Sequence, residues 1–202
     1  VGATAFTLNQ SAGTHSIANG TGGLGNNDSY ANMEGVIGTN LADSITGSPS
    51  KDIIRGEDGD DTLDGAGGSD LLDFSDAPVG ITFTLVQSAS NTSFTAFGQG
   101  TDTYKNFEGV IGTAFNDFLT GSKAADQLRG GGGSDVIGGQ AGDDRIVGGA
   151  GADWMTGGAG NDTFVFDTAP NAVDTVTDFN ASGSAADGDL IELSLAMFTA
   201  LA

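Results

Sequence analysis

The sequence predicts an all-β fold in which a parallel β-solenoid is built from pairs of nine-residue repeats. Residues 130–165 read GGGGSDVIG GQAGDDRIV GGAGADWMT GGAGNDTFV when they are divided every nine residues. The same frame covers six nonapeptides at 112–165, and four more lie at 38–73. A repeat this short and regular indicates a solenoid, in which each repeat packs only against its neighbours.

Two places of the nonapeptide carry the pattern in all ten copies. The sixth place is aspartate: Asp43, Asp52, Asp61, Asp70, Asp117, Asp126, Asp135, Asp144, Asp153 and Asp162. The eighth place is apolar: Ile45, Ile54, Leu63, Leu72, Leu119, Leu128, Ile137, Ile146, Met155 and Phe164. A glycine-rich, acidic composition by itself also fits a disordered linker. Ten apolar residues at one place have chance odds on the order of one in ten thousand, which argues against a linker.

A larger duplication surrounds the short repeat. DSYANMEGVIGTNLADSITGS at 28–48 matches DTYKNFEGVIGTAFNDFLTGS at 102–122, an offset of 74 residues. GSDLLDFSDAP at 68–78 matches GNDTFVFDTAP at 160–170, an offset of 92, and the difference of 18 equals two nonapeptides. Gain in pairs suits a flattened spiral whose coils have two strands and two turns. We therefore expect a first copy at 1–77, a second copy at 78–170 and a C-terminal capping segment at 171–202.

Each nonapeptide divides into a turn and a strand. The last three residues form a short strand with the eighth-place side chain inward, and the first six form a tight turn that needs glycine. AFTLNQ at 5–10 and ITFTLVQ at 81–87 alternate as half-buried strands do. No element is predicted for NTSFTAFGQGT at 91–101. DTVTDF at 174–179 and DLIEL at 189–193 predict short strands that cover the last edge.

Composition excludes several classes of function. Asp and Glu number 27 against 6 Lys and Arg, and the net charge of −21 argues against nucleic acid or anionic membranes as partners. No apolar run approaches the roughly 18 residues of a membrane span, and no N-terminal signal pattern is present. The chain begins with Val1, so we expect it to be part of a longer protein. His15 is the only histidine and GxSxG is absent, so we expect no enzymatic site.

The aspartates point to a divalent cation. Alternate nonapeptides stack at about 4.8 Å, so aspartates 18 residues apart align in four ladders. The ladders are Asp117–Asp135–Asp153, Asp126–Asp144–Asp162, Asp43–Asp61 and Asp52–Asp70. Carboxylates at that spacing repel by roughly 3.5 kcal/mol at an effective dielectric near 20, and a cation between them reverses the sign. Calcium accepts six to eight oxygens, carbonyls included, whereas magnesium demands an octahedron and zinc prefers His or Cys.

The GGxGxDxUx repeat resembles the RTX calcium-binding β-roll family. The resemblance covers the ten nonapeptides and, through their duplicated flanks, most of the chain. It implies a right-handed parallel β-roll in two duplicated blocks with a C-terminal β cap, and several Ca²⁺ ions held by the ten sixth-place aspartates with turn glycines. Those glycines are Gly56, Gly59, Gly130, Gly131, Gly133, Gly139, Gly142, Gly148, Gly149, Gly151, Gly157, Gly158 and Gly160.

Some acidic positions leave alternatives open. GTNLAD, GSPSKD, GTAFND and GSKAAD lack the second and fourth glycines, so these turns either bind calcium or close on side-chain packing alone. Asp58, Asp60 and Asp143 are expected in solvent. Glu34 and Glu108 are equivalent in the duplication and are expected to be polar anchors. A cap calcium at Asp178, Asp187 and Asp189 is an alternative for the tail.

The resemblance implies a module of a larger secreted bacterial protein, exported by type I secretion, that folds on binding calcium outside the cell. The alternative is a module that attaches a secreted enzyme or adhesin to polysaccharide or to a cell surface. Its contacts would come from the loops at 9–27 and 86–101, and Trp154 at an outward seventh place could stack on a partner. Both hypotheses place the protein outside the cell.

Overall fold

The computed structural model describes residues 4–8, 29–30, 35–38, 42–88, 90–96, 100–168, 172–181 and 188–194. Every regular element in these ranges is a strand, and the strands pair in parallel except β9 with β10. The predicted all-β parallel solenoid is confirmed. The ranges contain no helix with the length and apolar character that crossing a membrane requires.

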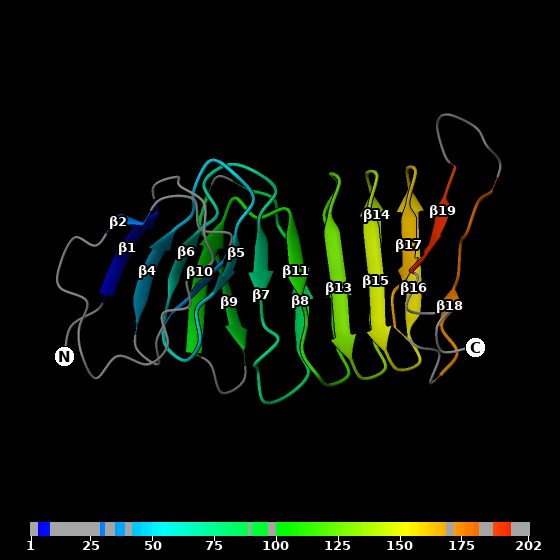
Figure 1. Ribbon diagram of the computed structural model, residues 1–202, viewed down its shortest axis with the longest axis horizontal. Helices are drawn as coiled ribbons and strands as arrows, with labels where there is room; N and C mark the ends of the chain where they lie inside the picture. The colour runs from blue at the N-terminus through cyan, green and yellow to red at the C-terminus, as the bar shows by residue number, and fades with distance from the viewer. Residues whose placement is uncertain are drawn as a thin grey trace. The chain divides into compact units, whose positions relative to one another are not determined.

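The chain forms two compact units, whose strands are labelled in Figure 1. The first unit comprises Val1–Ala77 and Val86–Glu108, and the second comprises Pro78–Leu85 and Gly109–Ala202. Residues 86–108 belong to the second copy of the sequence duplication but to the first compact unit. The reason is that β10 (Gly100–Lys105) pairs in parallel with β6 (Thr62–Asp64), which adds a rung to the first block.

The first unit has two rows of strands. One row has the order β2 (Ser29–Tyr30), β1 (Thr4–Leu8), β4 (Asp43–Thr46), β6, β10 and β9 (Thr92–Ala96). The other has the order β7 (Leu71–Asp73), β5 (Ile53–Arg55) and β3 (Val36–Ile37). The sequence at 91–101 predicted no element, yet residues 92–96 form β9, which pairs antiparallel with β10.

The second unit repeats this design with longer strands. One row has the order β18 (Thr175–Val176), β16 (Trp154–Ala159), β14 (Val136–Ala141), β12 (Phe118–Thr120) and β8 (Thr82–Thr84). The other has the order β19 (Leu190–Leu193), β17 (Thr163–Phe166), β15 (Arg145–Ala150), β13 (Gln127–Gly132) and β11 (Gly109–Ile111). The expected tail strands are present as β18 and β19, although both are shorter than the runs that predicted them.

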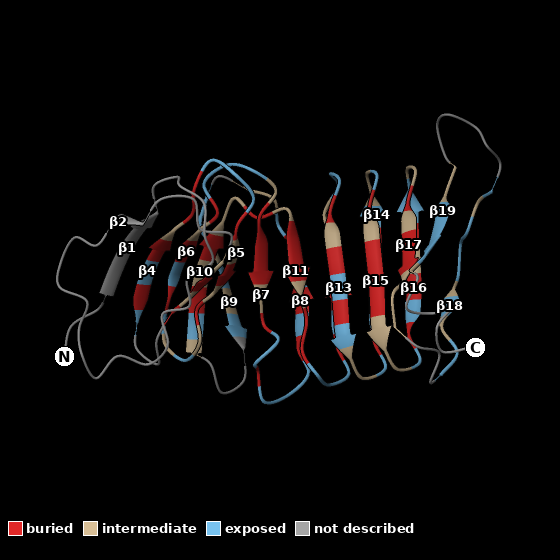
Figure 2. Ribbon diagram, in the orientation of Figure 1, coloured by how far each residue is buried: buried red, intermediate tan, exposed pale blue. Residues whose placement is uncertain are grey.

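The core is made by the eighth-place side chains. All ten are at most 1 % exposed, as the periodicity predicted. The register stacks them directly, with Leu128 on Ile146 and Ile146 on Phe164. Buried positions therefore run along the middle of successive strands (Figure 2). Phe83 in β8 is buried between exposed threonines, which confirms the alternation predicted for 81–87.

The turns have two backbone conformations. In six nonapeptides, those starting at 56, 65, 130, 139, 148 and 157, the second and fourth residues have positive φ. The fourth residue is always glycine, while Glu57, Ala66 and Gln140 take the second place with φ of 69°, 68° and 79°. The described positive-φ residues include none from the nonapeptides starting at 47, 112 and 121. We call the first kind glycine turns and the second kind hydroxyl turns, after Ser48, Thr113 and Ser122 in their second place.

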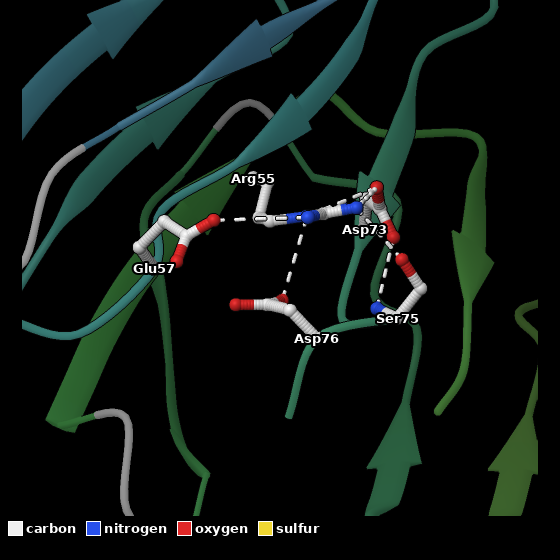
Figure 3. Close-up of polar contacts among 5 residues, drawn as sticks. All are labelled: Arg55, Glu57, Asp73, Ser75 and Asp76. Atoms are coloured by element: carbon white, nitrogen blue, oxygen red, sulfur yellow. Dashed lines mark hydrogen bonds and ion pairs between the residues drawn. The ribbon is translucent and has the colours of Figure 1, made fainter. Parts of the chain in front are cut away.

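Arg55 holds the end of the first block together (Figure 3). Its Nη2 lies 2.6 Å from Oδ2 of Asp73 and donates to Oγ of Ser75 at 2.7 Å. Asp76 and Glu57 complete the group, at 3.4 and 3.7 Å from the guanidinium. One of the few basic residues thus neutralises carboxylates that lie outside the aspartate ladders.

Alanine substitutions at two glycines of one nonapeptide are expected to change the free energy of unfolding differently. Gly133 has φ of 109°, and a Cβ there would meet the backbone of Phe115 and lie 2.7 Å from the nitrogen of Asn116. Gly138 has ordinary φ and no atom within 4 Å of an added Cβ. We expect Gly133→Ala to lower the free energy of unfolding by at least about 1–2 kcal/mol. Gly138→Ala should leave it unchanged or raise it by about 0.4–1 kcal/mol.

Urea unfolding in saturating calcium, followed by circular dichroism, measures both variants against the parent. Equal losses for the two alanines would contradict the proposed backbone constraint.

Candidate metal-binding turns

The ten sixth-place aspartates are buried, although each carries a titratable carboxyl group. Their exposed fractions are at most 4 %, while charged side chains are almost never fully buried unless they are paired. Each aspartate lies at the end of a turn or at the start of a strand. The inward eighth-place residue follows two positions later and fixes where the aspartate lies. The fold therefore places a row of carboxyl groups inside each edge of the roll.

A repeated hydrogen bond joins these aspartates into the predicted ladders. The backbone N–H of Asp117 donates to Oδ1 of Asp135 at 2.8 Å, and the N–H of Asp135 donates to Oδ1 of Asp153 at 2.9 Å. The same bond, at 2.8 or 2.9 Å, joins Asp126 to Asp144, Asp144 to Asp162, Asp43 to Asp61 and Asp52 to Asp70. In each of these pairs, Oδ1 of the later aspartate thus accepts a hydrogen bond from the coil before it.

The second carboxylate oxygen differs between the two kinds of turn. In every glycine turn it is buried and has no hydrogen-bond partner among the described residues. These atoms are Oδ2 of Asp61, Asp70, Asp135, Asp144, Asp153 and Asp162. Burying an acceptor without a partner costs about 1–3 kcal/mol, and more when the group is charged. Six such atoms on one structural motif indicate that something outside the chain completes them.

In the hydroxyl turns the second-place residue supplies that partner. The N–H and Oγ1 of Thr113 donate to Oδ2 and Oδ1 of Asp117 at 2.6 and 3.0 Å. Ser122 makes the same pair of bonds to Asp126 at 2.5 and 3.1 Å. Ser48 donates from both atoms to Oδ2 of Asp52, while Oδ1 of Asp52 is buried without a partner among the described residues. Two alternatives were open for these turns, and here the geometry favours closure by side chains; the equivalent Thr39 lies outside the described residues.

The first-place glycine forms a cradle beside each carboxylate. A Cβ on Gly47 would lie 2.6 Å from the carbonyl oxygen of Gly65 and 2.8 Å from Oδ2 of Asp52. A Cβ on Gly121 would lie 2.5 Å from the carbonyl oxygen of Gly139 and 2.7 Å from Oδ2 of Asp126. The equivalent pair of oxygens faces Gly38, Gly112, Gly130 and Gly139. A carboxylate oxygen and a carbonyl oxygen of the next coil therefore converge where any side chain would collide.

Carboxylate and carbonyl oxygens are the ligands that calcium accepts, so the residues present fit this ion. Among the described residues, no three acidic or histidine side chains gather around one point. A cation would therefore depend on main-chain carbonyls for part of its shell. The glycines at 38, 47, 65, 112 and 121 share the first place with Gly56 and Gly130 but were absent from the predicted set; the nine-residue frame was the signal that could have found them.

Burial strongly perturbs the glycine-turn aspartates. Burial raises the pKa of Asp61, Asp70, Asp135 and Asp144 to about 7. The ladder N–H groups lower these pKa values in part, and repulsion from neighbouring carboxylates raises them further. Burial also raises the pKa of Asp153 and Asp162. Without a cation, the four groups with a pKa of about 7 are partly protonated at neutral pH, and a cation would replace those protons.

Residues outside the repeat frame end each ladder. The N–H groups of Asp61 and Asp153 donate to Oδ1 of Asp102 and Asp174, and that of Asp162 donates to Oδ1 of Asp189, each at 3.0 Å. The sequence reasoning missed Asp102 and Asp174; the duplication of DSYANMEG as DTYKNFEG was the available signal for Asp102. Glu108 accepts from the N–H of Asp70 at 2.9 Å, the anchoring role expected of it.

The remaining acidic positions are also placed. Asp178 accepts from the N–H groups of Gly157 and Gly158. Glu34 and Asp187 lie outside the described residues. Asp60 and Asp143 are exposed as expected, but each accepts a backbone N–H, from Thr101 and Asn161 respectively.

Parallel coils with a cradle glycine and a buried aspartate in every nine residues define a metal-binding β-roll. Residues 37–72, 111–146 and 138–168 match the family model described as RTX calcium-binding nonapeptide repeat (4 copies). The chain thus contains RTX calcium-binding repeats, and the resemblance seen in the sequence is confirmed. A comparison with curated proteins gave no match.

The raised pKa values predict an unusual pH dependence for the metal-free protein. Because folding raises these pKa values, protonated aspartates stabilise the fold fully below about pH 4, and this stability is lost as the pH rises through about 7. We expect the metal-free chain to have more β structure, and a higher melting temperature where it is folded, at pH 5 than at pH 8. Calcium should stabilise it more at pH 8, where fewer protons compete.

Thermal melts in calcium-free buffer, repeated at high salt to screen general charge repulsion, measure this dependence. A metal-free protein that is more stable at pH 8 than at pH 5 would show that the buried carboxyl groups are not protonated in the fold.

Proposed function

We propose that the chain is a calcium-binding module of a larger secreted bacterial protein, and that it folds when it meets calcium outside the cell. One observation carries this proposal: six buried carboxylate oxygens lack a partner, one in each glycine turn. The RTX repeats support both calcium as the ion and an extracellular setting. The proposed role is binding rather than catalysis.

The glycine turns are the proposed sites. Their ligands are Oδ2 of Asp61, Asp70, Asp135, Asp144, Asp153 and Asp162 with carbonyl oxygens of the neighbouring turns. In the hydroxyl turns, Oδ2 of the aspartate accepts a hydrogen bond from the N–H of Ser48, Thr113 or Ser122, so the proposal assigns these turns little or no calcium. A bound ion supplies positive charge where ladder carboxylates would otherwise repel or hold protons.

The free energy of calcium binding at six sites is large enough to decide whether the module folds. At a free concentration ten times Kd, each site contributes about 1.4 kcal/mol, so six sites supply on the order of 8 kcal/mol. That is comparable to the whole stability of a typical domain. Inside the cell, where calcium is scarce, repulsion within a chain of net charge −21 keeps it open for export.

A calcium titration followed by far-UV circular dichroism tests this function. Asp135→Asn with Asp153→Asn keeps the size of both side chains and the Oδ1 acceptor, but removes the charge that a cation needs. We expect a cooperative gain of β signal with calcium and not with magnesium, and a midpoint about tenfold higher in the double variant.

The matched control is Asp143→Asn, which changes an exposed aspartate of a glycine turn and should keep the parent midpoint. A full β spectrum without calcium, unchanged by the double variant, would show that the aspartates only shape turns.

A second candidate function, attachment to an uncharged polysaccharide, is favoured by the outer face of the β8–β12–β14–β16 row. Phe118, Val136 and Trp154 are 50 %, 42 % and 55 % exposed and lie in register on neighbouring strands. Thr82 continues this row beside Phe118. A second outer row contains Thr84, Thr120 and Thr156.

This face has a composition unlike the rest of the chain. No outward residue of these strand segments is charged, although the net charge is −21, whereas the other row of the second unit bears Arg129, Arg145 and Glu192. Aromatic and apolar side chains beside hydroxyl groups suit the faces and hydroxyls of neutral sugar rings. Contacts repeated at the strand spacing of about 4.8 Å suit a ligand that is itself a repeating chain.

Sedimentation of the calcium-loaded protein with insoluble cellulose and chitin tests this role. We expect Trp154→Ala to reduce the bound fraction at least severalfold, because the largest exposed ring of the face is removed. Phe115→Ala removes an exposed aromatic ring from a turn, 47 % exposed against 55 % for Trp154, and should bind as the parent does. Parent-like binding by Trp154→Ala would move the contact to the loops first considered, of which 9–27 lies outside the described residues.

A further inference from the structure

The last glycine turn on one edge of the first unit, residues 65–70, has no nonapeptide stacked after it within its own block. The regular frame of this block ends at Asp73. Its carboxylate is nevertheless as deeply buried as the others: Asp70 is 0 % exposed, and its Oδ2 has no partner. The segment that lies against it in the first unit is 105–108, at the end of β10.

The backbone of this segment reproduces the missing coil. In a regular coil, the N–H of Gly47 donates to the carbonyl oxygen of Asp64 at 2.7 Å, and the carbonyl oxygen of Gly65 faces the cradle of Gly47. Here the N–H of Gly65 donates to the carbonyl oxygen of Lys105 at 3.1 Å. The carbonyl oxygen of Asn106 then faces the cradle of Gly65, together with Oδ2 of Asp70.

Asn106 is held in this position by its own geometry. Its φ is 57°, in the left-handed region, and asparagine tolerates that region better than most residues. Its Nδ2 donates to Oδ1 of Asp64 at 2.7 Å. Asn106, which lies outside the repeat, thus holds its carbonyl oxygen where the first-place glycine of a regular coil would hold its own.

Glu108 takes the place of the next ladder aspartate. The N–H of Asp52 donates to Oδ1 of Asp70 at 2.8 Å, and in the next step the N–H of Asp70 donates to Oε2 of Glu108 at 2.9 Å. In return, the N–H of Glu108 donates to the carbonyl oxygen of Asp70 at 3.0 Å. The longer side chain of Glu108 therefore places its carboxylate where the next sixth-place aspartate of the ladder would place its own.

We propose that Glu108 and the carbonyl oxygen of Asn106, which both lie outside the nonapeptide frame, complete a divalent-cation site at Asp70, with calcium as the ion. The proposal rests on the calcium-binding function proposed above and extends it to residues beyond the matched repeats. The buried, unpartnered Oδ2 of Asp70 is the independent sign of a ligand. The ion would fasten segment 86–108 to the first block across a break in the repeat.

Glu108→Gln separates this site from a purely structural anchor. Glutamine keeps an oxygen that can accept the N–H of Asp70, but it lacks the negative charge that a cation needs. Glu192→Gln is the control, because it makes the same change at an exposed glutamate that pairs with Arg145 in the second unit. Bound calcium is counted by equilibrium dialysis of the full chain, and far-UV circular dichroism at saturating calcium reports the fold.

We expect Glu108→Gln to bind one calcium ion fewer per chain than the parent, with the same β signal, while Glu192→Gln binds the parent number. An unchanged count overturns the site, as does a loss of several ions together with β signal, which would make Glu108 a structural anchor. A parent chain that binds no calcium at all instead refutes the proposed function, so the two failures are distinguishable.

Discussion

The hydrogen bond from the N–H of one sixth-place aspartate to Oδ1 of the aspartate 18 residues later is the interaction on which the structure depends. It fixes the stacking of successive coils at the edge of the roll, where the eighth-place side chains provide no contact. The same bond draws a carboxyl group into the interior and satisfies only one of its oxygens. The fold therefore creates a demand for a proton or a cation at the other oxygen, and the glycine cradle leaves room for it.

Two chemistries meet this demand in one architecture. In a hydroxyl turn, serine or threonine in the second place donates twice to the carboxylate, and the backbone stays in ordinary conformations. In a glycine turn, the second and fourth residues adopt positive φ, and the carboxylate oxygen remains unpaired. The second-place residue thus distinguishes a turn whose aspartate Oδ2 accepts a hydrogen bond within the turn from one whose Oδ2 is left unpaired.

Periodicity made most of the roll predictable from the sequence. A frame of nine places identified the buried row, the ladders and the parallel stacking, because each repeat contacts only equivalents of itself. The segment 86–108 was not predictable in this way, since β9 and β10 follow no nine-residue period and Asp61 meets Asp102 across 41 residues. Positive φ at Glu57, Ala66 and Gln140 was also hidden, because these side chains replace the glycine that normally marks such a conformation.

The hydroxyl turns also bear on the order in which the roll forms. Both blocks begin with two nonapeptides that carry serine or threonine in the second place, and the glycine turns follow. A stack of repeats forms by nucleation and then propagation, and the first coil is the costly one because it has no neighbour to pack against. In the second block, the first coil has its carboxylates hydrogen-bonded by Thr113 and Ser122, so it can serve as that nucleus without waiting for an ion. Each later coil then adds to an existing edge, so we expect the second block to grow from its N-terminal end toward its C-terminal end.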